Sequence, residues 1–229
     1  MVNLFLNDVR ACWLAQIGIW ANKIQFPEMA GHLYCAKHLL NPVVLNFMEN
    51  PNLLELPAFT HEGHLQGIIE IPAGTNHKFE YNKQTFEFQN DMRDGKHRVI
   101  DFLPYPVNYG FIPSTRMDPA RGGDGDPLDV LVLAEYLPTG TIIPVQPIGL
   151  LLLKDLGEWD NKVLAIPVDP AMRIVRATNW QEFQRDYSAA RHLLETFFLY
   201  YDGLGTMTPM GWDDEHAALA EVRKWLVKR

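Results

Sequence analysis

Three aspartates, Asp124, Asp126 and Asp129, fall within six residues at the entry to an apolar run. Like charges this close raise the free energy of the folded protein unless cations neutralise them. Carboxylate oxygens are hard ligands that suit Mg²⁺, Mn²⁺ or Ca²⁺. The cluster therefore indicates a divalent-cation site, although a solvated acidic turn would also explain it.

An EF-hand loop is an alternative for such a cluster, since Glu135 stands at the twelfth position counted from Asp124. That loop requires glycine at its sixth position, where this chain has Asp129. The apolar run Val130–Leu133 also continues as a strand pattern. The spacing therefore excludes an EF-hand.

A second acidic group, Asp155, Glu158 and Asp160, lies in a turn between apolar runs and is followed by Lys162. If both acidic turns meet at one rim of a barrel, they form a site for several metal ions. A carboxylate that bridges two ions sets the separation of about 4 Å used in two-metal hydrolysis. An exposed hairpin with incidental charges is the competing interpretation.

A third set of residues is cationic and phenolic. Lys78 and Glu80 are two apart, so they share one face of a strand, and Arg98, Tyr105 and Tyr109 follow. Arginine offers a rigid fork to phosphate oxygens and tyrosine offers a neutral donor. Carboxylates for metals beside cations for phosphate are what metal-assisted phosphoryl transfer to water requires.

The elements that position these residues are mostly short strands. Apolar or alternating runs, punctuated by Gly and Pro, predict strands at Ile68–Ile71, Phe79–Phe88 with a break at Asn82, Val99–Leu103, Leu128–Ala134, Thr141–Leu153 and Val163–Val168. No long helical pattern interrupts them, which disfavours a doubly wound sheet. We therefore expect a closed β core.

The end of the chain is helical in pattern. Apolar residues repeat at three and four residues from Phe183 to Phe198, which predicts a helix with a core-facing stripe. A second helix is expected to begin at the N-cap Asp213 and to carry Val222 and Trp225.

Composition limits the class of protein. The chain has 229 residues, 47% of them hydrophobic and 21% charged, which excludes wholesale disorder. Its net charge of -8 argues against a nucleic-acid backbone or an anionic membrane as partner. No apolar run approaches the ~20 residues of a membrane helix, and the N-terminus fits a signal peptide poorly. The two cysteines are expected to be reduced thiols, and the protein to be cytoplasmic.

Residues 1–66 read differently from the rest and are interpreted as an N-terminal extension of uncertain structure. They contain His32, Cys35 and His38, a spacing that could chelate zinc. A structural zinc site needs four ligands, and no fourth is evident nearby.

Taken together, the motifs resemble family I soluble inorganic pyrophosphatases from about Gly67 to the C-terminus, so residues 67–229 are interpreted as a pyrophosphatase domain. The resemblance rests above all on the run Asp124–Val130. It is continued by Glu70–Pro72, Lys78–Glu80, Gly95–Arg98, Tyr105, Asn108–Gly110, Asp155, Asp160, Lys162, Ala165–Pro167, Tyr201 and Gly211–Trp212.

The resemblance implies a mainly β, α+β fold: a five-stranded OB-like closed barrel with flanking C-terminal helices. It also implies hydrolysis of inorganic pyrophosphate to two orthophosphates with several Mg²⁺ ions, in a homo-oligomer that binds neither nucleic acid nor membrane.

Residue roles follow from the same resemblance. Asp124, Asp129 and Asp160 would hold the first metal, Asp129 would bridge to the second, and Asp155 and Asp160 would hold a further ion, with Glu70 and Glu80 in the outer shell. Asp126 would accept a proton from the attacking water, beside Tyr109 as a second catalytic residue. Lys78, Arg98, Tyr109 and Tyr201 would bind the phosphates, and Tyr105 and Lys162 would support the site, with Lys162 also on the substrate side.

Two departures from the family pattern stand out. Leu156 replaces a common Glu, and Asp202 replaces the Lys that usually follows the tyrosine matching Tyr201. We expect Asp202 to turn outward. The competing interpretation is weaker phosphate binding with a raised KM, in which case Asp202→Lys would lower KM.

Two other functions stay open at this point. Asp202 and Leu156 would suit a non-catalytic barrel that binds metal or phosphate, but such a module has no need for Asp126. A hydrolase of a larger phosphoanhydride, such as tripolyphosphate or a nucleotide, is the other alternative, although the chain has no P-loop.

Overall fold

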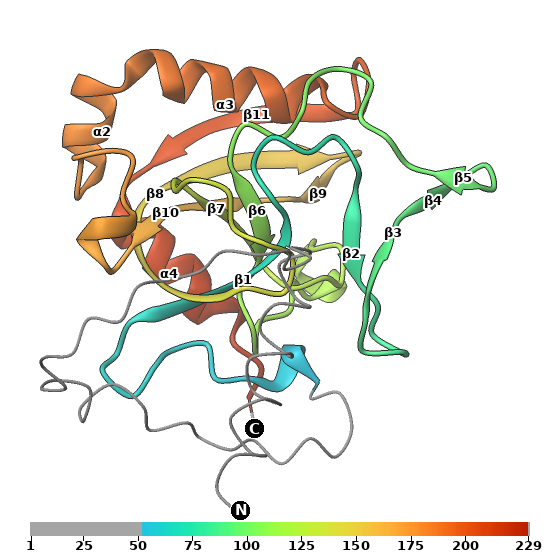
Figure 1. Ribbon diagram of the computed structural model, residues 1–229, viewed down its shortest axis with the longest axis horizontal. Coiled ribbons are helices and arrows are strands. Elements are labelled where there is room, and N and C mark those ends of the chain that lie inside the picture. The colour runs from blue at the N-terminus through green and yellow to red at the C-terminus, as the bar shows by residue number, and fades with distance from the viewer. Residues whose placement is uncertain (1–51, 229) are drawn as a thin grey trace, which may run out of the picture. The chain divides into compact units, whose positions relative to one another are not determined.

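The computed structural model describes residues 52–228 (Figure 1). Both cysteines and the possible zinc ligands lie outside this range, so the structure does not test the expectations for them. No helix among residues 52–228 is long and apolar enough to cross a membrane.

The fold is mainly β with a few helices, and one sheet of seven strands forms its centre (Figure 1). In spatial order the main path runs β1 (Leu65–Ile71), β6 (Asn108–Phe111), β7 (Asp129–Val132), β10 (Lys162–Pro167), β8 (Ile142–Asp155) and β11 (Met207–Asp213). The short β9 (Glu158–Trp159) pairs with the end of β8, and β8 also pairs back with β1. Only β7 and β10 are parallel among these pairs.

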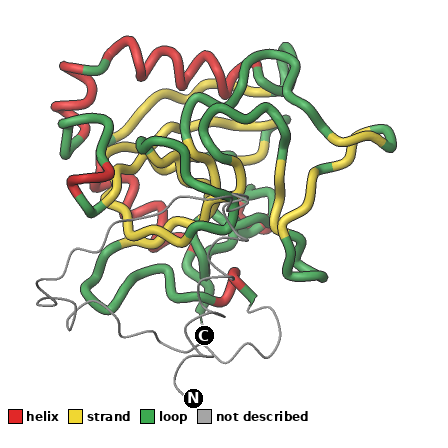
Figure 2. Tube along the Cα trace, viewed as in Figure 1, coloured by secondary structure: helices red, strands yellow, loops and turns green. Residues whose placement is uncertain are grey.

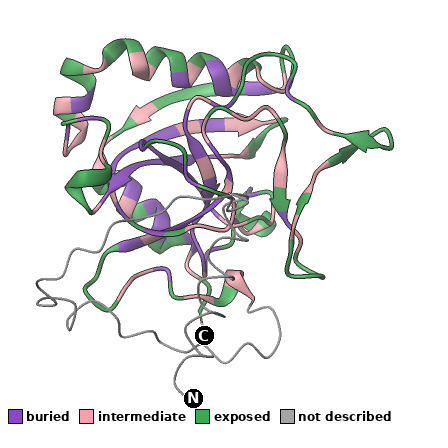
Figure 3. Ribbon diagram, in the orientation of Figure 1, coloured by how far each residue is buried: buried purple, intermediate pink, exposed green. Residues whose placement is uncertain are grey.

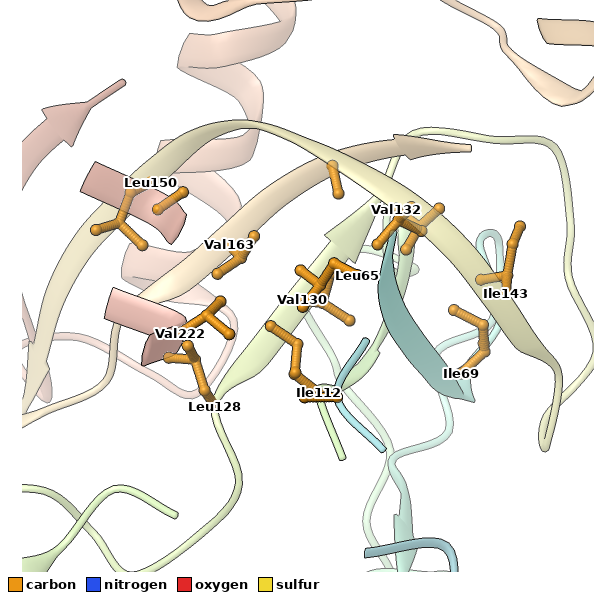
Figure 4. Close-up of a cluster of buried hydrophobic side chains, with 14 of the residues drawn as sticks. Leu65, Ile69, Ile112, Leu128, Val130, Val132, Ile143, Leu150, Val163 and Val222 are labelled. Carbon is orange, nitrogen blue, oxygen red and sulfur yellow. The ribbon is translucent and has the colours of Figure 1, made fainter. Parts of the chain in front are cut away.

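Four of the predicted apolar runs form strands, namely β1, β7, β8 and β10. All six residues of β10 are buried, and β8 carries a long buried stretch from Pro147 to Leu151. The inner faces meet in an aliphatic core to which Val130, Val163 and Leu150 belong, shown in Figure 4. Figure 3 shows that burial is concentrated on these strands.

Two small hairpins lie beside this sheet. β2 (Phe79–Tyr81) pairs with β3 (Phe88–Asn90), and β4 (Met92–Arg93) pairs with β5 (Lys96–His97). The β4–β5 hairpin projects from the body at the right of Figure 1, and all four of its strand residues are exposed.

The helices are short and mostly C-terminal (Figure 2). They are η1 (Leu53–Glu55), η2 (Pro119–Arg121), η3 (Pro170–Met172), α2 (Trp180–Asp186), α3 (Ser188–Tyr200) and α4 (Glu215–Trp225). The predicted stripe from Phe183 to Phe198 is divided between α2 and α3, because Tyr187 leaves the helical conformation at φ -127° and ψ 32°. α4 is capped by Asp214, one residue after the expected Asp213.

Two strand predictions need correction, and two strands of the central sheet were not expected. The run Phe79–Phe88 is strand only at its two ends, in β2 and β3, with a turn between them. Val99–Leu103 is a largely exposed connection in which only Val99 forms a bridge, with His77. β6 and β11 were not expected as strands. β6 contains Gly110, which packs so closely against β1 that a Cβ there would come within 1.8 Å of the Ile68 carbonyl oxygen. β11 contains a proline and a glycine that the pairing accommodates by an irregular register.

Candidate active site

A polar cavity of about 330 Å³ opens at one end of the sheet and gathers most of the predicted site. Ten of the twelve predicted residues line it: Glu70, Lys78, Glu80, Tyr109, Asp124, Asp126, Asp129, Asp155, Asp160 and Tyr201. Lys162 contacts two of these carboxylates from within the sheet, whereas Arg98 lines a neighbouring cavity that shares Tyr201.

The first acidic turn is built by backbone constraints around Gly123. Asp118 caps η2 through its side chain, and Gly122 ends that helix in the left-handed region at φ 80°. Gly123 packs against Met117 so closely that a Cβ would lie 2.5 Å from the Met117 carbonyl carbon. Asp124 then accepts a hydrogen bond of 2.8 Å from the backbone N–H of Asp126.

The second acidic turn contacts the first, which is the condition that the sequence analysis set for a shared metal site. The backbone N–H of Trp159 donates to the carbonyl oxygen of Gly122 at 2.8 Å, and Gly123 forms a bridge with Trp159. Asp155, Glu158 and Asp160 therefore line the same cavity as Asp124 and Asp126.

Lys162 lies at the centre of the charges. It is the register partner of Asp129 across the parallel strands β10 and β7, so its ammonium reaches Asp129 Oδ2 at 2.7 Å and Asp160 Oδ1 at 2.9 Å. Its side chain is 1% exposed. Burial opposes the charged lysine, but the charges of Asp129 and Asp160 outweigh it and raise the pKa of Lys162 well above its ordinary value.

The carboxylates around Lys162 are poorly solvated. Burial raises the pKa of Asp129 to about 6, with Lys162 acting in the opposite direction and Asp160 adding to the rise. Burial likewise raises the pKa values of Asp160 and Asp124, to which neighbouring aspartates contribute. Eight acidic side chains line the cavity against two lysines, and Lys162 adds a third cation, so acidic groups outnumber cations there.

Tyr109 and Tyr201 line the cavity, with Tyr105 packed against both. The Tyr109 hydroxyl donates to Asp129 Oδ2 at 2.6 Å, and the Tyr109 and Tyr201 rings both contact the buried ring of Tyr105. Burial raises the pKa of all three phenols, so they remain neutral donors at physiological pH.

Glu70, Glu80 and Lys78 also line the cavity. Glu70 accepts a hydrogen bond of 2.7 Å from the Tyr81 backbone N–H, yet desolvation raises its pKa to about 8. Lys78 and Glu80 lie on one face, as alternation predicts, and their charges pair at 2.6 Å.

Asp126, the predicted proton acceptor, pairs with a residue that the sequence motifs did not single out. The Lys83 ammonium binds Asp126 Oδ1, and both side chains are about half exposed. Lys83 follows β2 in the turn after Asn82, so only its place just beyond the Lys78–Glu80 motif could have drawn attention to it.

The donor set fits divalent cations. It consists of carboxylate oxygens, which are the hard ligands that Mg²⁺ prefers. Asp155 Oδ1 is buried and has no hydrogen-bond partner, which is a costly arrangement for a carboxylate unless a cation completes it. Among residues 52–228 no three His, Cys, Asp or Glu side chains converge tightly enough to hold an ion as they stand, and Lys162 lies between Asp129 and Asp160.

Asp202 does not turn outward, contrary to the expectation. Its side chain is 18% exposed, and its carboxylate contacts Arg98 at 2.5 Å and Arg93 at 2.7 Å. Arg98 also binds Asp91 at 2.9 Å. Neither Arg93 nor Asp91 was anticipated. For Arg93 nothing in the local sequence points to a partner 109 positions away. Leu156, the other departure, is exposed in the left-handed region at φ 47°.

The structure is a mainly β protein whose polar cavity is lined by carboxylates, lysines and tyrosines. The model of the inorganic pyrophosphatase family matches residues 67–228. The chain belongs to the inorganic pyrophosphatase family.

Individual relatives agree with this assignment. The chain is 35% identical over 182 residues to an inorganic pyrophosphatase of Synechocystis, covering 76% of this chain and 96% of the relative. It is 33% identical over 169 residues to that of Saccharolobus solfataricus, covering 71% and 90%. Its structure resembles the crystal structure of inorganic pyrophosphatase from Thermus thermophilus, with a TM-score of 0.66, 32% identity, and coverage of 77% and 97%.

Proposed function

We propose that this chain is an enzyme that hydrolyses inorganic pyrophosphate to two orthophosphates, and that the cavity around Asp129 is its active site. The observation that carries the proposal is the meeting of two acidic turns around Lys162 and Tyr109 in one cavity. That arrangement suits a substrate rich in phosphate oxygens and accompanied by cations.

Mg²⁺ is the proposed cofactor, as several ions. Asp124, Asp129 and Asp160 would hold the first, with Asp129 shared with the second, while Asp155 and Asp160 would hold a further ion and Glu70 and Glu80 would act from the outer shell. Bound Mg²⁺ supplies a lowered water pKa and neutralises charge on phosphate oxygens. The unpartnered oxygen of Asp155 and the excess of acidic over cationic side chains in the cavity support this assignment.

Side chains of the protein would orient the water, accept its proton and bind the phosphate groups. Asp126 is exposed at the mouth of the cavity, where its carboxylate can orient a water and accept its proton. Tyr109 fixes Asp129 through its hydroxyl and remains a neutral donor. Lys78, Arg98, Lys162 and Tyr201 provide charge and hydrogen bonds to phosphate oxygens, with Tyr105 packed behind Tyr109 and Tyr201.

The reaction balances without any further reactant. The water oxygen bonds to one phosphorus, and the bond from that phosphorus to the bridging oxygen breaks. The bridging oxygen stays with the second phosphate, and the proton taken by Asp126 is returned to the products. The cations offset the charge that builds up on the leaving phosphate.

Finer features of the protein also remain proposals. The circular pairing β1–β6–β7–β10–β8–β1 supports a five-stranded OB-like closed barrel. We also propose a cytoplasmic homo-oligomer that does not bind nucleic acid or membranes, in line with the acidic net charge of -8.

Phosphate release from pyrophosphate with Mg²⁺, with and without EDTA, tests the function. Asp126→Asn should abolish most of the release, whereas Asp186→Asn should not, since Asp186 lies in an exposed pair with Arg185. Release that survives in Asp126→Asn would move the proton acceptor elsewhere. A folded, Mg²⁺-loaded protein with no release would favour the non-catalytic alternative, and preferential cleavage of tripolyphosphate would favour the larger substrate.

A further inference from the structure

Six charged side chains form a chain of alternating sign that leads out of the cavity. In order, the residues are Glu80, Lys78, Asp91, Arg98, Asp202 and Arg93, and each contacts the next within 4.0 Å. Three of them are cations and three are carboxylates. The cations proposed to bind phosphate are therefore neutralised by the protein itself before substrate arrives.

Arg98 is the most constrained member of this chain. Its side chain is 9% exposed, with Nη1 bound to Asp91 Oδ2 at 2.9 Å and Nη2 bound to Asp202 Oδ1 at 2.5 Å. Its Nε is buried and has no hydrogen-bond partner. A phosphate oxygen that is to bind the guanidinium fork on the Nη2 side must displace the Asp202 carboxylate.

Arg93 provides a second partner for that carboxylate. It binds Asp202 through two parallel hydrogen bonds, with Nη1 at 2.7 Å from Oδ1 and Nη2 at 3.1 Å from Oδ2. Bidentate pairs of this kind are strong and directional. Arg93 lies on the exposed β4–β5 hairpin and is itself 53% exposed, so it can hold Asp202 without entering the cavity.

We propose that Asp202 competes with phosphate for Arg98, and that Arg93 is a positioning residue that weakens this competition by sharing the Asp202 carboxylate. The inference rests on the proposed function, in which Arg98 binds a phosphate group. Asp202 thereby raises KM for pyrophosphate and speeds release of orthophosphate, while Arg93 keeps both effects moderate.

The test is a double-mutant cycle of Arg93→Gln, Asp202→Asn and the double variant, with KM and kcat for pyrophosphate and the dissociation constant of inorganic phosphate as readouts. Asp202→Asn should lower KM and the phosphate dissociation constant by roughly fivefold, with kcat equal or lower because release slows. Arg93→Gln should raise both constants when Asp202 is present. It should change little when it is combined with Asp202→Asn, because its effect passes through the carboxylate.

Lys96→Gln is the matched control, since Lys96 is the register partner of Arg93 on the same hairpin and its substitution removes the same charge. It should leave both constants near those of the unaltered protein. Asp202→Ser repeats the comparison with a shorter side chain, and thermal unfolding shows that each variant is folded.

Three results would overturn the inference. A KM that stays constant or rises in both Asp202 variants would show that Asp202 does not compete with phosphate. An equal effect of Arg93→Gln with and without the Asp202 carboxylate would mean that Arg93 acts on phosphate directly. If Lys96→Gln had the same effect as Arg93→Gln, the loss of any positive charge on the hairpin would explain the result. Failure of the proposed function is a separate outcome, because the unaltered protein would then release no phosphate, while calorimetry would still report how Asp202 affects phosphate binding.

Discussion

Lys162 and Asp129 face each other as register partners on the two parallel strands of the sheet, and their charged groups lie 2.7 Å apart. Parallel pairing places their side chains on the same face at the same height. The contact that centres the charges of the cavity is thus set by one backbone register. A shift of a single residue in β7 or β10 would turn Asp129 or Lys162 to the other face.

The first prediction concerns Lys162→Met. Removing one partner of a buried ion pair leaves an uncompensated charge, so we expect the metal-free protein to lose about 3–5 kcal/mol of unfolding free energy. Mg²⁺ should restore part of this loss by neutralising Asp129 and Asp160. Urea unfolding in EDTA and in excess Mg²⁺ measures both effects. An equal loss in the two conditions would argue against a cation near these carboxylates.

The second prediction concerns the pH dependence of stability through Glu70. Its pKa of about 8 in the folded protein exceeds the ordinary value, so between about pH 4.5 and 8 the folded state binds the proton more tightly than the unfolded state. The unfolding free energy of the metal-free protein should therefore fall as pH rises through this window. Glu70→Gln cannot ionise and should flatten that fall. Urea unfolding of both proteins at a series of pH values in EDTA measures this dependence. If the unfolding free energy of Glu70→Gln falls with pH as steeply as that of the unaltered protein, Glu70 is not the group responsible.

The sequence could predict those parts of the candidate site whose residues lie close together along the chain. The aspartate turns and the Lys78–Glu80 face were found because their spacing alone carries the information. β6 and β11 were missed because Gly110 and Pro209 interrupt the strand pattern. β6 is held by pairing with β1 and β7, and β11 by pairing with β8. The contact of Arg93 with Asp202 spans 109 positions, so it exists only once the hairpin and the end of α3 have folded together.

The third prediction concerns Lys83→Gln. The pair of Lys83 with Asp126 is half exposed, so its loss should change the unfolding free energy by about 1 kcal/mol or less. Asp126 would lose the contact that orients it, and kcat should fall roughly threefold to tenfold with KM little affected. Steady-state kinetics on pyrophosphate separates the two constants. Lys96→Gln is again the charge-matched control. An unchanged kcat in Lys83→Gln would mean that Lys83 does not position Asp126 for catalysis.

The last prediction concerns Gly123→Ala, because this glycine holds both acidic turns in place. An added Cβ would lie 2.5 Å from the Met117 carbonyl carbon and 2.6 Å from its oxygen, both of them backbone atoms that cannot rotate away. The loop must therefore move, and the bridge between Gly123 and Trp159 that joins the two turns would be strained.

We expect Gly123→Ala to cost about 2 kcal/mol or more of unfolding free energy and to weaken Mg²⁺ binding, since Asp124 would shift away from Asp160. Calorimetric titration with Mg²⁺ and urea unfolding measure the two effects on the same sample. Ala120→Ser, an exposed change in the neighbouring helix η2, should alter neither. Loss of stability with unchanged Mg²⁺ affinity would mean that the two turns hold their positions independently. The proposal that Asp124 of one turn and Asp160 of the other hold the same ion would then be wrong.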